Sequence, residues 1–391
     1  MKKKLLARFL IITMLANIST NLAHPITPTF IKSLNLGNYM FGVAFASLAI
    51  GQFLFSPLVG KLTDSIGERK EMTLGMALYA LGQFFFMISK TEWMIVLARL
   101  FSGVSISFYM VGALTYVIRL SDSETQGKNL TIYTTIQTVF STFGYLLGGL
   151  LGDTSIYYSF ILQIILLLLV ALLTYLFTIE REEYVEEKIS FSDVNPFRFI
   201  SNGKDILTTV LVILFVITFA GSLASTAYDQ TFNYYIKDVF NFKPSYNGYI
   251  KAITGIASFI VNMTIAIHIQ QKRDCGKSLV IIFGLCALLL FTFVKVENIW
   301  VVLIIAVSYY AVNSIYLPVL QNLSAKCCTT ENSGKVMGYS NAMKSLGMIF
   351  GALVAGFIYD VNPTFPFILA SITFLIATLL TVLYVKKKQM N

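Results

Sequence analysis

The sequence predicts an all-α integral membrane protein in which twelve transmembrane helices form two pseudo-symmetric six-helix bundles. Three observations predict this fold: an apolar composition, a one-sided distribution of basic residues, and an internal repeat. Of the 391 residues, 56% are hydrophobic and 13% are charged, whereas about a quarter of the residues in soluble domains are charged. A soluble core of this size cannot hide so many apolar side chains. A soluble enzyme, a disordered chain and a nucleic-acid-binding domain are therefore excluded as leading interpretations.

Twelve apolar segments, separated by short polar breaks, are each close to the roughly 20 residues that a helix needs to cross a bilayer. Six of them lie within residues 1–179 and six within residues 206–391, and we expect these ranges to be the two bundles. The glutamate-rich segment 180–205 is expected to be a cytoplasmic linker. The twelve segments are residues 6–31, 40–60, 71–89, 93–118, 130–152, 156–179, 206–236, 247–268, 279–296, 299–323, 336–358 and 364–385.

Basic residues are concentrated in every second connection between the segments. Because cytoplasmic connections carry an excess of Lys and Arg, this pattern favours an even number of spans with both termini in the cytoplasm. The net charge of +9 is therefore a topology signal and not a surface for nucleic acid. Most of the 29 Lys and Arg residues fall on the inner side, and those expected on the outer side are Lys32, Lys90, Lys237, Lys243, Lys251 and Lys295.

Two stretches, residues 124–153 and 331–360, align without a gap. Shared apolar character alone would not align the charged residues at both ends, so we interpret the match as a duplication of a six-span unit. Duplicated halves are common in secondary transporters, whose substrate site lies between the halves near the middle of the bilayer. The matched residues are Glu124 with Glu331, Gly127-Lys128 with Gly334-Lys335, Gly144 with Gly351, Gly149 with Gly356, and Asp153 with Asp360.

A glycine- and aspartate-containing connection follows the second span. It reads Gly60-Lys61-Leu62-Thr63-Asp64-Ser65-Ile66-Gly67-Glu68-Arg69-Lys70. This pattern resembles the signature loop of the major facilitator superfamily, G-x-L-x-D-x-x-G-x-[RK]-[RK], in the same place between spans 2 and 3. The resemblance implies the major facilitator fold and a conformational latch on the cytoplasmic side. The residues that match the latch are Gly60, Asp64, Gly67, Arg69 and Lys70.

The fourth and fifth spans carry two further motifs. Arg99 and Gly103 match the R-x-x-x-G motif of the same family, in which the arginine is linked to proton transfer. The fifth span has Gly144-Tyr145-Leu146-Leu147-Gly148-Gly149, where proton-driven exporters have G-P-x-x-G-G, so Tyr145 replaces the proline. The sequence looks most like the twelve-span drug:proton antiporter group. That group implies proton-coupled efflux of amphipathic compounds by alternating access.

Four ionisable side chains lie deep in the predicted spans, where such groups are costly and usually functional. Asp229 is the candidate proton-coupling residue, together with Arg99 and His24; the alternative is an aspartate at a helix end that outer water reaches. His24 precedes Pro25 in a first helix that we expect to be kinked. Lys344, which aligns with Gln137 in the repeat, is expected either to bind an anionic substrate group or to pair with Asp229.

Polar and aromatic side chains along the spans are the remaining candidates for a substrate cavity, because pockets for amphiphiles are mostly aromatic with few polar groups. Ordinary packing is the alternative for each of them. These candidates are Asn21, Gln52, Tyr109, Gln137, Phe140, Tyr228, Phe232, Asn313 and Tyr316.

We therefore expect a proton-coupled secondary transporter of the bacterial cell membrane, most simply a monomeric exporter with small-molecule substrates. No cofactor or metal site is expected, because the sequence contains no nucleotide-binding loop, metal-ligand spacing or nucleophile motif. An enzyme is likewise not expected. The second interpretation is an exporter or importer of one anionic or zwitterionic metabolite, such as a siderophore, which Lys344 and Tyr145 favour.

Overall fold

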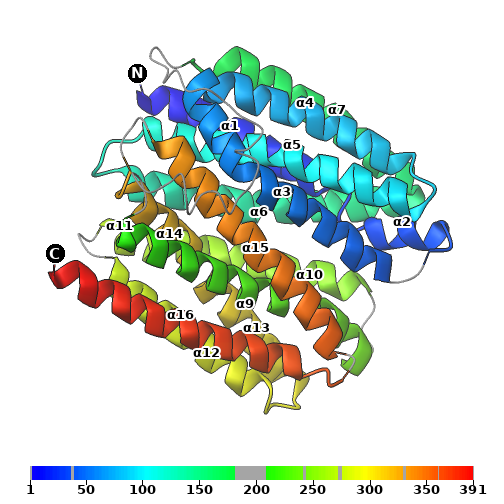
Figure 1. Cartoon of the computed structure of the whole chain (residues 1–391). Coiled ribbons are helices and arrows are strands. Elements are labelled where there is room, and N and C mark those ends of the chain that lie inside the picture. Colours follow the sequence, from blue (N-terminus) through cyan, green and yellow to red (C-terminus); the bar gives the residue numbers. More distant parts are fainter. Residues whose placement is uncertain are drawn as a thin grey trace. The chain divides into compact units, whose positions relative to one another are not determined.

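The computed structural model describes residues 2–36, 39–180, 208–240, 244–271, 275–328, 332–359 and 361–390. All regular secondary structure in these residues is helical (Figure 1). The first half contains α1 (Lys2–Asn21), α2 (Thr27–Ser33), α3 (Tyr39–Ile66), α4 (Glu68–Met87), α5 (Glu92–Arg119), α6 (Gln126–Thr154) and α7 (Ile156–Phe177). The second half contains α9 (Thr209–Phe240), α10 (Pro244–Val261), the π-helix η3 (Asn262–Ala266), α11 (Ile267–Gln271), α12 (Gly276–Phe293), α13 (Ile299–Asn313), α14 (Tyr316–Ala325), α15 (Ser333–Tyr359) and α16 (Phe365–Met390).

Each of the twelve predicted segments is helical in the structure, so the predicted all-α membrane fold is confirmed. Among the described residues, nine helical segments are long and apolar enough to cross a membrane. The predicted spans in α1, α4 and α6 fall outside this group. Two of these helices begin with a charged turn, Lys2–Lys4 in α1 and Glu68–Glu71 in α4, and α6 is rich in Thr, Ser and Gly.

Proline residues explain the two places where a predicted span is divided. Proline has no N–H to donate, and its ring clashes with the carbonyl group four residues earlier. Four residues before Pro25 is Asn21, where α1 ends, so the expected kink is a full break between α1 and α2. Four residues before Pro318 is Ser314, which separates α13 from α14.

The contacts divide the chain into two compact units. Unit 1 comprises Met1–Gln126, Ile136–Ile206 and Cys328–Ala342, and unit 2 comprises Gly127–Thr135, Leu207–Cys327 and Met343–Asn391. The first turns of α6 therefore belong to unit 2, and the first turns of α15 belong to unit 1. The expected linker at 180–205 lies outside the described residues except for Glu180.

Glycine residues bring one helix pair in each unit into backbone contact. In unit 1, a Cβ atom on Gly144 of α6 would clash with the carbonyl oxygen of Ile18 in α1, and one on Gly148 would clash with that of Leu22, the residue directly after α1. In unit 2, a Cβ atom on Gly347 or Gly351 of α15 would clash with the carbonyl oxygens of Phe219 or Leu223 in α9. The two repeats therefore use the same small-residue contact between corresponding helices.

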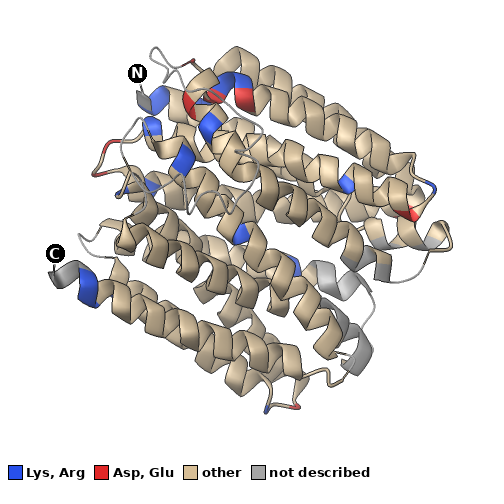
Figure 2. Ribbon diagram, viewed as in Figure 1, with Lys and Arg blue, Asp and Glu red and all other residues tan. Residues whose placement is uncertain are grey.

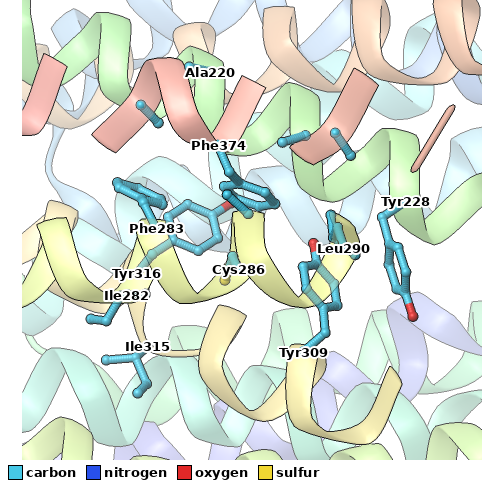
Figure 3. Close-up of a cluster of buried hydrophobic side chains, with 14 of the residues drawn as sticks. Ala220, Tyr228, Ile282, Phe283, Cys286, Leu290, Tyr309, Ile315, Tyr316 and Phe374 are labelled. Carbon is cyan, nitrogen blue, oxygen red and sulfur yellow. The ribbon is translucent and has the colours of Figure 1, made fainter. Parts of the chain in front are cut away.

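Aromatic side chains form the centre of unit 2. The ring of Tyr228 lies 4.2 Å from that of Tyr309 and 5.2 Å from that of Phe232, measured between ring centroids. Figure 3 shows Tyr228 and Tyr309 near a neighbouring group that contains Cys286, Phe283, Tyr316 and Phe374. This core holds α9, α12, α13, α14 and α16 together and fixes the helix that carries Asp229.

Candidate functional site

The signature segment is a tight junction between two helices and not an extended loop. Gly60 to Ile66 continue α3, and α4 begins at Glu68, so Gly67 alone separates them. Gly67 has φ 85°, a conformation that a residue with a Cβ atom rarely adopts. A glycine at this position is therefore required by the backbone, which gives the second glycine of the motif its physical reason.

Asp64 binds the first turn of α15. Its Oδ1 accepts a hydrogen bond from the backbone N–H of Gly334 at 3.1 Å, and its Oδ2 accepts one from that of Lys335 at 3.1 Å. Gly60 and Gly334 are in backbone contact beside these bonds. A carboxylate at this position satisfies free N–H groups at a helix start and opposes the positive end of the helix dipole. The contact thus ties the end of α3 to α15.

The basic residues of the motif hold the end of α7. Glu180 Oε1 lies 3.0 Å from Lys70 Nζ, its Oε2 lies 4.0 Å from Arg69 Nη1, and the Arg69 guanidinium stacks over the ring of Tyr175 at 4.4 Å. Arg69 and Lys70 therefore act within unit 1 and connect α4 to α7.

Three further charged residues belong to this cluster, and sequence reasoning missed them as site residues. Arg119 at the end of α5 has its Nε 3.0 Å from Oε1 of the fully buried Glu68, and its Nη2 donates to the carbonyl oxygen of Ile179 at 3.1 Å. Glu71, one turn after Glu68, is also fully buried. The signal in the sequence is the pair of acids three residues apart, which places both on one face of α4.

The geometry around Glu71 indicates which group carries a proton. Oγ1 of Thr63 lies 2.9 Å from the carbonyl oxygen of Val59 and 2.5 Å from Oε2 of Glu71. A threonine hydroxyl has one proton to donate, so it serves one of these two oxygens. A proton on Glu71 satisfies both contacts, because Glu71 then donates to Thr63 while Thr63 donates to Val59.

Arg99 is buried in unit 1. Among the described residues, no carboxylate forms an ion pair with its guanidinium. Arg99 is 4% exposed. Its Nη2 donates to Oγ1 of Thr27 at 3.1 Å, and its guanidinium lies over the ring of Phe86 at 3.9 Å. The break between α1 and α2 places Thr27 at this point. His24, in the same break, stacks on Tyr145 with ring centroids 5.5 Å apart, so the residue that replaces the motif's proline covers the histidine.

Asp229 on α9 pairs with Lys251 on α10. Lys251 Nζ lies 3.6 Å from Asp229 Oδ1, and it donates to the hydroxyl oxygen of Tyr310 at 3.2 Å. The side chains of Asp229 and Lys251 are 42% and 30% exposed. The sequence predicts Lys251 only as a basic residue on the outer side, and Lys344 as either a substrate-binding residue or the partner of Asp229. In the structure the partner of Asp229 is Lys251, because Lys251 on α10 and Tyr310 on α13 lie beside the carboxylate.

The remaining cavity candidates have varied surroundings. In unit 2, Oδ1 of Asn313 accepts a hydrogen bond from the hydroxyl of Ser225 at 3.1 Å, and the hydroxyl oxygen of Tyr316 lies 3.5 Å from the same serine oxygen. Tyr228 and Phe232 lie in the aromatic core. In unit 1, Asn21 donates to the carbonyl oxygen of Asn17 at 2.8 Å. Gln52 and Tyr109 are buried, and Gln137 and Phe140 are partly buried.

These features define a multi-pass membrane protein of the duplicated transporter class. They are the long apolar helices, the helix contact that recurs in both repeats, and the charged side chains inside apolar helices. Figure 2 shows how sparse charge is along the ribbon. The model of the Major Facilitator Superfamily matches residues 9–294 and 271–390. The chain therefore belongs to the Major Facilitator Superfamily, whose members are membrane-embedded transporters of small molecules.

The similarity to related proteins covers nearly the whole chain. Multidrug resistance protein 2 of Bacillus subtilis is 24% identical over 374 residues, which cover 95% of this chain and 93% of that protein. The quinolone resistance protein NorA of Staphylococcus aureus is 22% identical over 360 residues, which cover 90% of this chain and 89% of that protein. The crystal structure of the human organic anion transporter MFSD10 superposes with a TM-score of 0.83 at 17% identity, covering 97% of this chain and 99% of that chain. That structure shares the fold.

Proposed function

We propose that the protein is a proton-coupled secondary transporter that exports amphipathic compounds by alternating access. The observation that carries the proposal is the Asp229–Lys251 pair inside apolar helices, with Tyr310 beside it. The names of the relatives, which are multidrug and quinolone resistance proteins, support export of amphipathic compounds. The fold supports transport by two halves around a central site.

Asp229 is the group that exchanges the proton in this proposal. As a carboxylate it is attracted to Lys251, and as a neutral acid it loses that attraction. Proton binding therefore changes the force between α9 and α10 and so shifts the balance between two conformations. The proposal requires water to reach this acid, whose side chain is partly exposed. Arg99 keeps its charge at every physiological pH, so we assign it a fixed electrostatic role.

Asp64 supplies the latch in the same scheme. Its two hydrogen bonds to the first turn of α15 must break if α3 and α15 separate at this end. We place this end, together with both chain termini and the linker 180–205, in the cytoplasm of a bacterial cell. The ranges 1–179 and 206–391 are then the two moving bundles, and the protein works as a monomer.

The coupling proposal predicts that Asp229→Asn abolishes uphill transport without loss of folding. Asparagine has nearly the same size as aspartate but binds no proton in this pH range. We expect norfloxacin added to proteoliposomes under a pH gradient to release protons through the native protein and not through the variant. A pH-sensitive dye inside the vesicles measures this flux.

Glu297→Gln is the matched control, because it also removes one negative charge from unit 2. Glu297 is exposed in the connection between α12 and α13, so its substitution should leave proton flux unchanged. Uphill accumulation by the Asp229→Asn protein, at a rate near that of the native protein, would show that the coupling group lies elsewhere.

A further inference from the structure

Lys344 is a cation in the middle of a transmembrane helix. In α15 (Ser333–Tyr359) it lies about 16 Å from the first residue and about 22 Å from the last, at 1.5 Å of rise per residue. The side chain is partly buried. Among the described residues, no ion pair or hydrogen bond of its ammonium group is found. The aligned position of the first repeat holds the neutral Gln137, so the charge is a feature of the second half alone.

The carboxylates of unit 2 whose side chains the structure describes do not supply a partner for Lys344. Asp229 is paired with Lys251. The other carboxylate of unit 2 for which the structure describes a side chain, Glu297, is exposed beyond the end of α12. Away from the helix ends, the described side chains of the second half therefore include two lysines, Lys251 and Lys344, and one acid, Asp229.

Helix packing also separates Lys344 from Asp229. Gly347 of α15 contacts Phe219 of α9, and Gly351 contacts Leu223, so the two helices run parallel in a constant register. In this register Lys344 is level with residue 216 of α9. Asp229 is thirteen residues further along α9, which corresponds to about 20 Å. The two charged sites of unit 2 are therefore separate.

An ammonium group in an apolar span has lost much of its hydration, so a negative charge placed beside it gains more than it would in water. The contact between α15 and α9 that begins one turn after Lys344 includes an aromatic pair. Phe219 lies against Gly347, one turn along from Lys344, and its ring is 6.1 Å from that of Phe350. An amphipathic organic anion matches this combination, with its acidic group at the lysine and its rings along the helices.

We propose that Lys344 binds the acidic group of the transported substrate, so that the protein prefers amphipathic organic acids and zwitterions over neutral or purely cationic compounds of the same size. This inference rests on the proposed transport function, and it names the substrate class. The acidic group is a carboxylate or a sulfonate, which forms a charge-assisted hydrogen bond with the ammonium group.

Equilibrium binding to purified protein tests the inference with pairs of labelled compounds that differ only in the acid. The probes are 2-naphthoate with 2-naphthamide, 1-pyrenebutyrate with its amide, and 1-pyrenesulfonate with its sulfonamide. For at least one pair, we expect native protein to bind the acid roughly tenfold or more tightly than the amide, as one charge-assisted contact allows. Lys344→Gln should remove the preference while amide binding stays unchanged, and Lys344→Arg should retain it.

Lys326→Gln is the matched control, because Lys326 is an exposed lysine after α14 and its loss changes the net charge equally. The control should keep the native preference. The inference is wrong if native protein prefers none of the acids, or if Lys344→Gln keeps the preference. Since this assay uses no gradient, Asp229→Asn should keep the preference as well. A failure of proton coupling and a failure of anion binding are therefore told apart.

Discussion

Glu68 and Glu71 lie one turn apart on α4, and both are fully buried, yet their neighbours give them opposite chemistry. Glu68 faces the guanidinium of Arg119 at 3.0 Å, so it is held as a carboxylate. Glu71 faces a threonine hydroxyl that also lies against a backbone carbonyl, an arrangement that a proton on Glu71 satisfies. The same residue type therefore pairs with a guanidinium at one position and with a hydroxyl at the other.

This difference predicts that replacing glutamate by glutamine affects stability at only one of the two positions. Glu71→Gln should leave the melting temperature near that of native protein, because the amide N–H donates to Thr63 as the protonated acid does. Glu68→Gln should lower stability by about 3 kcal/mol, since Arg119 loses its buried partner. Thermal melting of the two purified variants measures both. A large loss for Glu71→Gln with little loss for Glu68→Gln would mean that the two protonation states are reversed.

At the scale of helices, small residues decide which pairs approach most closely. Gly148 of α6 lies directly against the carbonyl oxygen of Leu22 at the end of α1, whereas a Cβ atom on the neighbouring Gly149 would meet Pro25 at an ordinary distance of 4.0 Å. The repeat shows the same contrast: Gly351 contacts α9, and a Cβ atom on Gly356 would have nothing within 4 Å. One face of each helix therefore needs glycine and the adjacent face does not.

Alanine substitutions separate these two faces. Gly148→Ala should destabilise the protein by about 1–3 kcal/mol, because the added methyl group forces α1 and α6 apart. Gly149→Ala should be neutral or slightly stabilising, since alanine favours a helix over glycine by up to about 1 kcal/mol. Melting temperatures of the two purified variants are compared under identical conditions. Equal effects at the two positions would mean that α1 and α6 do not touch through Gly148.

At the scale of the whole molecule, the sequence predicts where the helices lie along the chain but only some of the contacts between them. Long apolar runs predict all twelve helical segments, and proline chemistry accounts for the break before Pro25. The pairing of Asp229 with Lys251 is different, because it joins two helices whose relative rotation no spacing along the chain reveals. The same holds for Asp64 and the first turn of α15, which lie far apart in sequence. Periodicity identifies the face of a helix, and packing decides what that face meets.

The proposed orientation is also a property of the whole chain, and its native cysteines test it. Cys327, after α14, is exposed and Cys328 is partly exposed, whereas Cys275 and Cys286 are buried. The connection after α14 is expected in the cytoplasm, because Lys326 lies in it and Lys335 in the first turn of α15, in accord with the positive-inside pattern. A membrane-impermeant maleimide should therefore leave the protein unlabelled in intact cells and label it in inside-out vesicles.

Two variants make this labelling experiment decisive. A Cys327→Ser, Cys328→Ser double variant should lose the label in vesicles, because the buried thiols of Cys275 and Cys286 are shielded by the core of unit 2. Adding Glu297→Cys to that variant should restore labelling in intact cells, since the connection between α12 and α13 lies on the opposite side of the membrane. Labelling of native protein in intact cells would mean that every connection lies on the side of the membrane opposite to the one proposed. The Asp64 latch would then lie at the outer surface, and the direction in which Asp229 carries protons would have to be reversed with it.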